Sequence, residues 1–541
     1  MNRRVALTLE RRTRLASFVP ASFRRRRVFW QETAEPWRNN GNTVSFSRTR
    51  SAAHRAVQEE RGRAMANVGG RRKPAADARL EAIKKLFPEA VVDGGIDWEL
   101  LKRVFGGHER QEAYEFTWPG KAEARRLAEL PASGVLRPDR AASKQWETTN
   151  NWYIEGDNLE ALKLLRTSHA GTIQMIYIDP PYNTGKVLTY KDNWRKGKAV
   201  VPSGIQEEAR AHAGWLNMMY PRLWVARELL AETGAIFISI DDTEQANLRK
   251  MCDEIFGERN FVATFIWQRA FSPVNMNKFA SRNHDFILCY AKNIDRLAWY
   301  GLPRHPEADG RYANPDNDPR GPWTSGDLSV GPPISEKIYE IVTPSGRVVS
   351  PPNGYCWRVT KERFAELAAD NRIWFGKDGS GVPRLKRFLS EVKPTVTPLT
   401  IWTHDEVSHS QEAKKELKEL FDGLAVMDYP KPVKLIQRMV ALTTRDDDLI
   451  LDFFSGSATT AHAVMQQNAE DGGRRSFMMV QLPERLAETS EAYRVGFRTI
   501  CDIGRERIRR AGEKIVYETG KTELDIGFKV FRIERTNQPA R

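Results

Sequence analysis

The sequence predicts an α/β protein built on a mostly parallel sheet, and three observations support this. An apolar run, Ile173–Ile178, stops at two prolines that cannot continue a sheet ladder, which indicates a short buried strand. Residues 215–244 alternate between helix, glycine turn, apolar strand and helix, as parallel sheets do. A second apolar strand, 448–452, runs into a small-residue turn and a helix. Ligands of such sheets bind outside the carboxyl ends of the strands.

The chain of 541 residues is too long for one ordinary domain. We expect five parts. They are an arginine-rich leader at 1–70, an N-terminal helical region at 71–135, a first half of the sheet domain at 136–300, an insert at 301–425, and a second half at 426–541. Within the second half, the basic stretch 503–514 is expected to be a helix that mostly faces solvent.

The net charge of +14 suggests a polyanionic partner, but its distribution weakens the inference. Residues 1–64 hold 15 Arg, 5 Glu, no Lys and no Asp, so ten of the 14 net charges lie there. This leader could be a nucleic-acid-binding arm, a disordered segment, or sequence upstream of a true start at Met65. Charge alone therefore does not identify DNA as the partner.

The four cysteines are isolated in the sequence, at Cys252, Cys289, Cys356 and Cys501. Their spacing fits reduced cysteines of a cytoplasmic protein. No stretch is apolar for long enough to span a membrane, and the start lacks the apolar core of a signal peptide. We find neither the ligand spacing of a zinc site nor the glycine-rich phosphate loop of nucleoside triphosphatases.

The strand 173–178 ends in Asp179-Pro180-Pro181-Tyr182, which suits methyl transfer to the amino nitrogen of a nucleobase. If Asp179 accepts one amino hydrogen and the Pro180 carbonyl the other, the nitrogen becomes tetrahedral and its lone pair can attack. Proline suits this role because it has no N–H and a fixed φ. Tyr182 offers a ring on which a base extruded from its duplex can stack. The alternative is a plain proline turn after a core strand.

A second polar turn, Gly156-Asp157-Asn158, follows the strand expected at 151–155. Asp157 and Asn158 could accept from and donate to the edge of an adenine ring. Either could instead cap the helix that begins near Leu159.

The turn after strand 448–452 contains Asp452, Phe454, Gly456, Ser457, Ala458 and Thr459. Its small residues would let a ligand approach the backbone N–H groups at the start of a helix. The next strand, 477–482, ends at Glu484, whose carboxylate is placed to accept both hydroxyls of a ribose. The alternative for Glu484 is a surface residue that opens a helix.

The insert is loop-like at 311–323 and then interleaves aromatic residues with arginine and lysine, as at Trp357-Arg358, Trp374–Lys377 and Pro383–Phe388. This mixture fits a surface that contacts phosphates and base edges. It equally fits an irregular domain with ordinary core tryptophans.

Together these residues resemble the modification (methyltransferase) subunits of type III restriction-modification systems, from about Tyr114 to Val530. Six motifs carry the resemblance in order. They are Trp118-Pro-Gly-Lys121, Ile154-Glu-Gly-Asp-Asn-Leu159, Tyr177-Ile-Asp-Pro-Pro-Tyr-Asn-Thr-Gly185, Asn317-Asp-Pro-Arg-Gly-Pro-Trp323, Leu451-Asp-Phe-Phe-Ser-Gly-Ser457 and Val480-Gln-Leu-Pro-Glu484. The catalytic motif precedes the cofactor loop, an order similar to the β-group of amino-methyltransferases.

The resemblance implies a Rossmann-like, S-adenosyl-L-methionine-dependent fold and methylation of adenine N6 in double-stranded DNA. It makes the insert a target-recognition region. It implies that Lys431 and Pro432 lie near the methionine end of the cofactor, Asp157 and Asn158 near its adenine, and Glu484 on its ribose. Subunits of this kind form homodimers and pair with a separate helicase-nuclease restriction subunit.

One position departs from the family pattern, because Ala458 stands where the cofactor loop usually ends in glycine. Alanine is expected to fit only with a negative φ, and we expect weakened cofactor binding. The rival functions are methylation of cytosine N4 or of RNA, a DNA-binding subunit that has lost catalysis, and a purely structural partner of a restriction complex.

Overall fold

The computed structural model describes residues 83–88, 91–92, 95–97, 114–185, 207–273, 278–304 and 306–535. The leader predicted at 1–70 lies outside these ranges. The chain divides into two compact units, Met1–Ala113 and Tyr114–Arg541. In the first unit, β1 (Val91–Val92) pairs antiparallel with β2 (Gly95–Ile96).

The second unit is organised by a ten-stranded sheet in the order β18-β7-β8-β6-β5-β19-β20-β4-β21-β3. In chain order the strands are β3 (Gly134–Lys144), β4 (Trp152–Glu155), β5 (Ile173–Ile178), β6 (Leu230–Ile240), β7 (Phe261–Gln268), β8 (His284–Ala291), β18 (Ile401–Trp402), β19 (Leu449–Asp452), β20 (Ser476–Gln481) and β21 (Phe528–Arg535). Neighbouring strands are parallel except where β8 meets β6 and β7, and where β3 meets β21. The predicted α/β fold with a mostly parallel sheet is confirmed.

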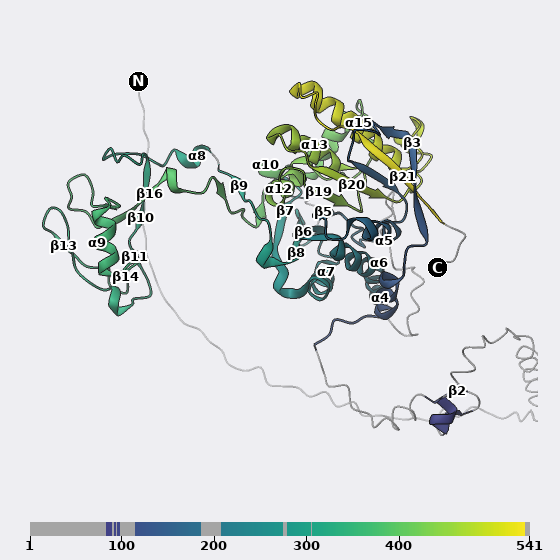
Figure 1. Ribbon diagram of the computed structural model, residues 1–541, viewed down its shortest axis with the longest axis horizontal. Helices are drawn as coiled ribbons and strands as arrows, with labels where there is room; N and C mark the ends of the chain where they lie inside the picture. The colour runs from purple at the N-terminus through teal and green to yellow at the C-terminus, as the bar shows by residue number, and fades with distance from the viewer. Residues whose placement is uncertain are drawn as a thin grey trace, which may run out of the picture. The chain divides into compact units, whose positions relative to one another are not determined.

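Helices cover both faces of this sheet (Figure 1). One face carries α4 (Lys121–Glu129), α5 (Asn158–His169), α6 (Glu207–Leu229) and α7 (Gln245–Cys252), and the other carries α12 (Val433–Thr443), α13 (Thr459–Asp471) and α15 (Ile500–Thr519). All six residues of β5 are buried. Ile176 and Ile178 face the core under α4, α5, α6 and α7, whereas Met175 and Tyr177 face the core under α12, α13 and α15. A strand covered on both faces reads as a continuous apolar run, which is why the sequence identified it.

Two helices, α4 and α15, differ from the predictions. Helix α4 packs Ala124 and Ala128 into the core of the sheet, so residues 121–129 do not belong to a separate N-terminal region. Helix α15 is not mostly solvated, since it buries Ile503, Arg507, Ile508 and six further positions that include Ala511 and Ile515. Arginines and glutamates between these positions conceal the apolar stripe in the sequence.

The predicted insert ends earlier than residue 425, because β18 joins the sheet and α11 (Ser410–Leu420) packs with Ile500 and Ile503 in a third core. The elements before it are β9 (Leu302–Pro303), α8 (Pro306–Asp309), β10 (Trp323–Asp327), β11 (Ser329–Val330), β12 (Ile341–Val342), β13 (Val348–Val349), β14 (Cys356–Trp357), α9 (Lys361–Ala369), β15 (Ile373–Trp374), β16 (Arg384–Phe388) and β17 (Thr395–Val396). The remaining short helices are η2 (Asp253–Gly257), η3 (Glu258–Asn260), η4 (Ile294–Arg296), η5 (Ser335–Lys337), η6 (Leu389–Glu391), α10 (His404–Val407) and α14 (Glu491–Arg494). Within the described residues, no helix combines the length and the apolar character needed to cross a bilayer.

The insert has a small core of its own, which includes Leu328, Ile341, Trp357, Leu367 and Ile373. Trp323 and Phe388 are also buried. Of the two interpretations of its aromatic residues, ordinary core packing therefore applies to these side chains.

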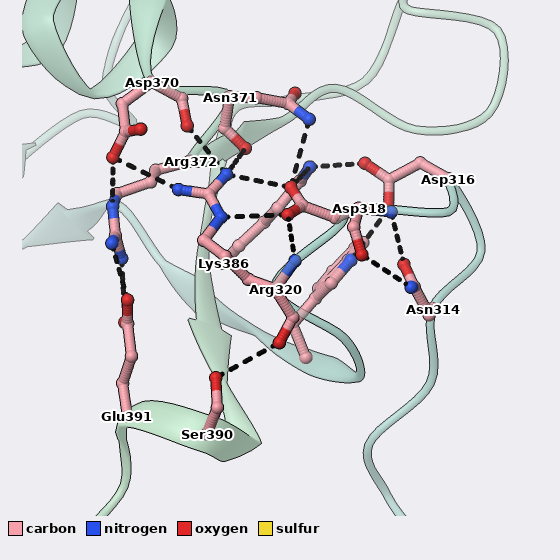
Figure 2. Close-up of polar contacts among 11 residues, drawn as sticks. Asn314, Asp316, Asp318, Arg320, Asp370, Asn371, Arg372, Lys386, Ser390 and Glu391 are labelled. Atoms are coloured by element: carbon pink, nitrogen blue, oxygen red, sulfur yellow. Dashed lines mark hydrogen bonds and ion pairs between the residues drawn. The ribbon is translucent and has the colours of Figure 1, made fainter.

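The motif Asn317–Trp323 is held by a polar network around Asp318 (Figure 2). The fully buried Asp318 carboxylate accepts two hydrogen bonds of 2.9 Å from Arg320, and Lys386 Nζ lies 3.3 Å from it. Asn371 Nδ2 donates to the same carboxylate at 3.1 Å, and Lys386 also pairs with Asp316. These contacts tie the loop before β10 to β16 and to the turn before β15, so the motif braces the insert from within.

Replacing the centre of this network tests its role. We expect Asp318→Asn to destabilise the insert by about 3–5 kcal/mol, the range for breaking one side of a buried ion pair. Hydrogen bonds from Arg320 hold the pKa of Asp318 well below its usual range, so its contribution is present above the unfolded pKa of about 3.9 and is lost as pH falls further. Hydrogen exchange of the β16 amides measures the effect.

The matched control is Asp327→Asn, which removes an exposed ion pair to Arg384 in the same sheet and is expected to change little. Equal exchange rates in the two variants would contradict a bracing role for Asp318.

Candidate active site

The three predicted turns lie along one edge of the sheet because their strands are parallel neighbours. Strand β5 pairs with β19, β19 with β20, and β20 with β4. The carboxyl ends of these strands therefore place Asp179, Asp452 and Asp157 on the same rim. The sequence separation is large, but the sheet order brings the turns together as predicted.

The Asp179 carboxylate is held by Lys431, which precedes α12. Lys431 Nζ donates to both carboxylate oxygens at 2.6 Å and to the Tyr182 hydroxyl at 3.0 Å. The Lys431 side chain is 11% exposed and that of Asp179 is 26% exposed. The resemblance implied that Lys431 lies at the methionine end of the cofactor, whereas its ammonium group here contacts the predicted catalytic turn, Asp179–Tyr182.

The backbone of the catalytic turn is fixed by a tryptophan of α6. Trp215 Nε1 donates to the Pro181 carbonyl at 2.6 Å. Among the described residues no donor contacts the neighbouring carbonyl of Pro180, the group predicted to accept an amino hydrogen. The Pro181 carbonyl is thus occupied by Trp215, and the role predicted for the Pro180 carbonyl stays a prediction.

The residue after the tetrapeptide is anchored by Glu244, at the start of α7. Asn183 adopts a positive φ of 61° and donates to Glu244 Oε1 at 2.7 Å. The fully buried Glu244 carboxylate also contacts His212 Nδ1 and accepts from Asn247, each at 2.7 Å. Sequence reasoning missed Glu244, whose position directly before an amphipathic helix is a weak signal for such a role.

Several acidic side chains lie near Asp179. Asp285, at the start of β8, is buried beside Arg269, and burial raises its pKa to about 6 although Lys431 and Arg269 act in the opposite direction. Asp452 is buried too, and burial raises its pKa to about 7. It accepts from the Thr460 hydroxyl at 2.5 Å and from the backbone N–H of Phe454 at 3.0 Å. These two hydrogen bonds connect Asp452 to both ends of the loop that follows β19.

Asp157 and Asn158 serve as a helix cap and as part of a cavity wall. Asp157 Oδ1 accepts from the first backbone N–H groups of α5, and its other oxygen accepts from Arg222 at 3.0 Å. Asn158 accepts from Arg222 at 2.5 Å and donates to the Phe453 carbonyl at 2.7 Å. The capping interpretation is thus correct, and Arg222 is a further site residue that the sequence did not reveal.

A cavity of about 360 Å³ opens at this rim, a size typical of small-molecule sites. It is lined by the predicted residues Asp157, Asn158, Asp179, Pro181, Phe454, Gly456 and Glu484, and by Met218, Arg222, Met427, Tyr429, Phe453, Gln481, Leu482 and Ile500, which were not predicted. A smaller pocket beside it is lined by Asp179, Lys431, Asp452, Ser457 and Thr459, among others. Pro432 occupies the N-cap position of α12 and lines neither the cavity nor the smaller pocket.

Ala458 has a left-handed backbone, with φ 62° and ψ 41°, so the expectation of a negative φ is wrong. Its methyl group is fully buried in the core beneath α12, α13 and α15 and lines neither pocket. On either side, Ser457 and Thr459 accept hydrogen bonds from Arg507 Nη1 at 2.8 and 2.6 Å. Burial lowers the pKa of Arg507 to about 10. Arg507 therefore holds the loop on both sides of Ala458, and the Ala458 methyl group does not crowd the cavity.

The chain is similar in sequence to known proteins. Residues 173–510 match the family model described as DNA methylase. The chain is 36% identical to the StyLTI Mod subunit of a type III restriction-modification enzyme from Salmonella typhimurium, over 83% of this chain and 71% of that protein. It is 34% identical to the EcoPI Mod subunit of Escherichia phage P1, over 84% and 77%. It is 31% identical to the type II methyltransferase M.KpnI of Klebsiella pneumoniae, over 67% and 87%.

The geometry of Ala458 gives a direct prediction. Ala458→Gly should remove a backbone cost of about 1–2 kcal/mol for a left-handed residue, partly offset by the loss of a buried methyl group. Because the methyl group points away from the cavity, the Kd for S-adenosyl-L-methionine should change less than about twofold. Calorimetric titration of both proteins measures this. A tenfold gain in affinity would mean that alanine does weaken the cofactor site.

Proposed function

Because the chain belongs to the family of DNA methylases that includes the type III modification subunits, and is therefore a DNA methyltransferase, we propose that it transfers a methyl group from S-adenosyl-L-methionine to N6 of adenine in duplex DNA. The observation that carries the proposal is the position of Asp179, which belongs to the Asp-Pro-Pro-Tyr turn and also lines the cavity. Cofactor and target base would meet at this carboxylate.

The lining of the cavity fits S-adenosyl-L-methionine. The Glu484 carboxylate is suited to the ribose hydroxyls, and the wall near Asp157 and Asn158 to the adenine edge. Phe453 and Ile500 supply the apolar surface that an adenine ring needs. When bound, the cofactor supplies an electrophilic methyl group on a sulfonium.

The chain's own residues prepare the nucleophile. Asp179 accepts one hydrogen of the target amino group, and the Pro180 carbonyl accepts the other. The nitrogen would become tetrahedral, its lone pair would be free to take the methyl group, and the proton that it loses would pass by way of Asp179 to solvent. The Tyr182 ring carries the extruded base. This arrangement needs no covalent enzyme intermediate, and much of its rate gain comes from positioning.

The proposal extends to a partner, an assembly and a location. The relatives are named as Mod subunits of type III restriction-modification enzymes, which supports a separate restriction (helicase-nuclease) subunit as a partner. A homodimer as the assembly and the cytoplasm as the location rest on the sequence motifs and the resemblance they carry. The insert up to residue 396 would contact DNA and select the site.

Methyl transfer from labelled S-adenosyl-L-methionine to duplex DNA, followed by digestion to nucleosides, tests the proposed reaction. Label in N6-methyladenine is the expected result. Label in N4-methylcytosine would mean that cytosine, and not adenine, is the target base. Label on RNA in a parallel reaction, with none on duplex DNA, would refute the DNA substrate.

The same assay tests the catalytic turn. Asp179→Ala and Tyr182→Ala should each lower turnover by about 10²–10³-fold, the range for losing a group that acts on the reacting atoms. Asp242→Ala, an exposed acidic residue just beyond the neighbouring strand β6, is the matched control and should keep full activity. Turnover near that of the unmodified enzyme in both turn variants would disprove the assignment.

A further inference from the structure

We propose that Lys431 is a positioning residue of the catalytic turn, which holds Asp179 and Tyr182 in the geometry that receives the target amino group, and that it is not a ligand of the methionine end of the cofactor. The inference rests on the proposed function and assigns a role within the same site.

The hydrogen bonds of Lys431 are fully committed to the catalytic turn. An ammonium group has three hydrogens to donate. Lys431 Nζ has three oxygen partners, two on Asp179 at 2.6 Å and one on Tyr182 at 3.0 Å. No hydrogen is left over for a cofactor carboxylate. Consistent with this, Lys431 lines the smaller pocket and is absent from the lining of the 360 Å³ cavity.

The backbone around Lys431 is stiff. It lies between Pro430 and Pro432, each with a fixed φ, and Pro432 directly precedes the largely buried helix α12. The ammonium group also lies 5.1 Å from the centre of the Tyr182 ring and 5.8 Å from that of Trp267. Lys431 thus connects the segment before α12 to the turn after β5, and it fixes the hydroxyl end of the ring on which the base would stack.

The surrounding charges explain why a cation is needed there. Asp285 and Asp452 are buried carboxyl groups that interact electrostatically with Asp179, and the Tyr177 and Tyr182 hydroxyls lie in the same surroundings. Arg269 is the second cation, and it pairs with Asp285. Without Lys431, Asp179 would face Asp285 with no counter-charge of its own and would be driven from its position.

Lys431 need not leave when the base arrives. A carboxylate offers about four acceptor positions on its two oxygens. Two remain for other donors while Lys431 is bound, so an amino hydrogen can reach Asp179 beside the ammonium. Lys431 therefore selects which lone pairs of Asp179 face the base.

The test compares Lys431→Met with Lys434→Met, a matched control on the exposed face of the first turn of α12. We expect Lys431→Met to lower the single-turnover methylation rate at saturating cofactor and DNA by about 10²-fold. Its Kd for S-adenosyl-L-methionine, measured by titration without DNA, should stay within about threefold of the unmodified value. Lys434→Met should change neither quantity.

A second pair of variants separates electrostatic positioning from simple packing. Adding Asp285→Asn to Lys431→Met removes the charge that repels Asp179, and we expect it to restore the methylation rate about tenfold over Lys431→Met alone. Loss of packing would not be repaired in this way. No recovery in the double variant would overturn the electrostatic part of the account.

The cofactor titration also decides the question without methyl transfer. A rise in Kd of tenfold or more in Lys431→Met, with an unchanged rate at saturating cofactor, would make Lys431 a cofactor ligand and overturn the inference. If the unmodified enzyme bound S-adenosyl-L-methionine but methylated no DNA, the proposed function would fail. An unchanged Kd in Lys431→Met would then still exclude Lys431 as a cofactor ligand.

Discussion

The parallel pairing of β5 with β19 is the constraint on which the site depends. It joins strands more than 270 residues apart in sequence and places the turns after Asp179 and Asp452 side by side. Strands β20 and β4 extend the same edge and add Glu484 and Asp157. Because the insert leaves and rejoins the sheet on the other side of β6, at β8 and β18, its loops and small sheets can vary without moving the rim.

The rim concentrates acidic side chains in partly buried positions, and such charges are costly unless they are paired. Three of these carboxylates are each paired with one cation. Lys431 pairs with Asp179, Arg269 with Asp285, and Arg222 with Asp157. Asp452 has no cation within hydrogen-bonding distance among the described residues, and burial raises its pKa accordingly. The site is therefore built by charge pairing as much as by the shape of the sheet.

Short-range sequence patterns were sufficient to predict the parts of the site whose residues lie close together in the chain. The apolar strands, the Asp-Pro-Pro-Tyr turn, the cap at Asp157 and the loop before α13 follow from short-range patterns. Contacts across the fold could not be predicted. The periodicity of α15 gives no sign that Arg507 is buried behind the cofactor loop, and nothing near Lys431 in sequence indicates that it reaches Asp179. The backbone of Ala458 was mispredicted because a left-handed alanine is tolerated only where surrounding contacts, here from Arg507 to both neighbours, enforce it.

If the cavity at this rim holds the cofactor next to Asp179, photolabelling with methyl-labelled S-adenosyl-L-methionine should mark the residues that line it. Peptide mapping is then expected to find label on peptides that contain Tyr429 or Phe453 and Phe454, suppressed by excess unlabelled cofactor. Label confined to the insert, residues 306–396, would mean that the cofactor binds elsewhere.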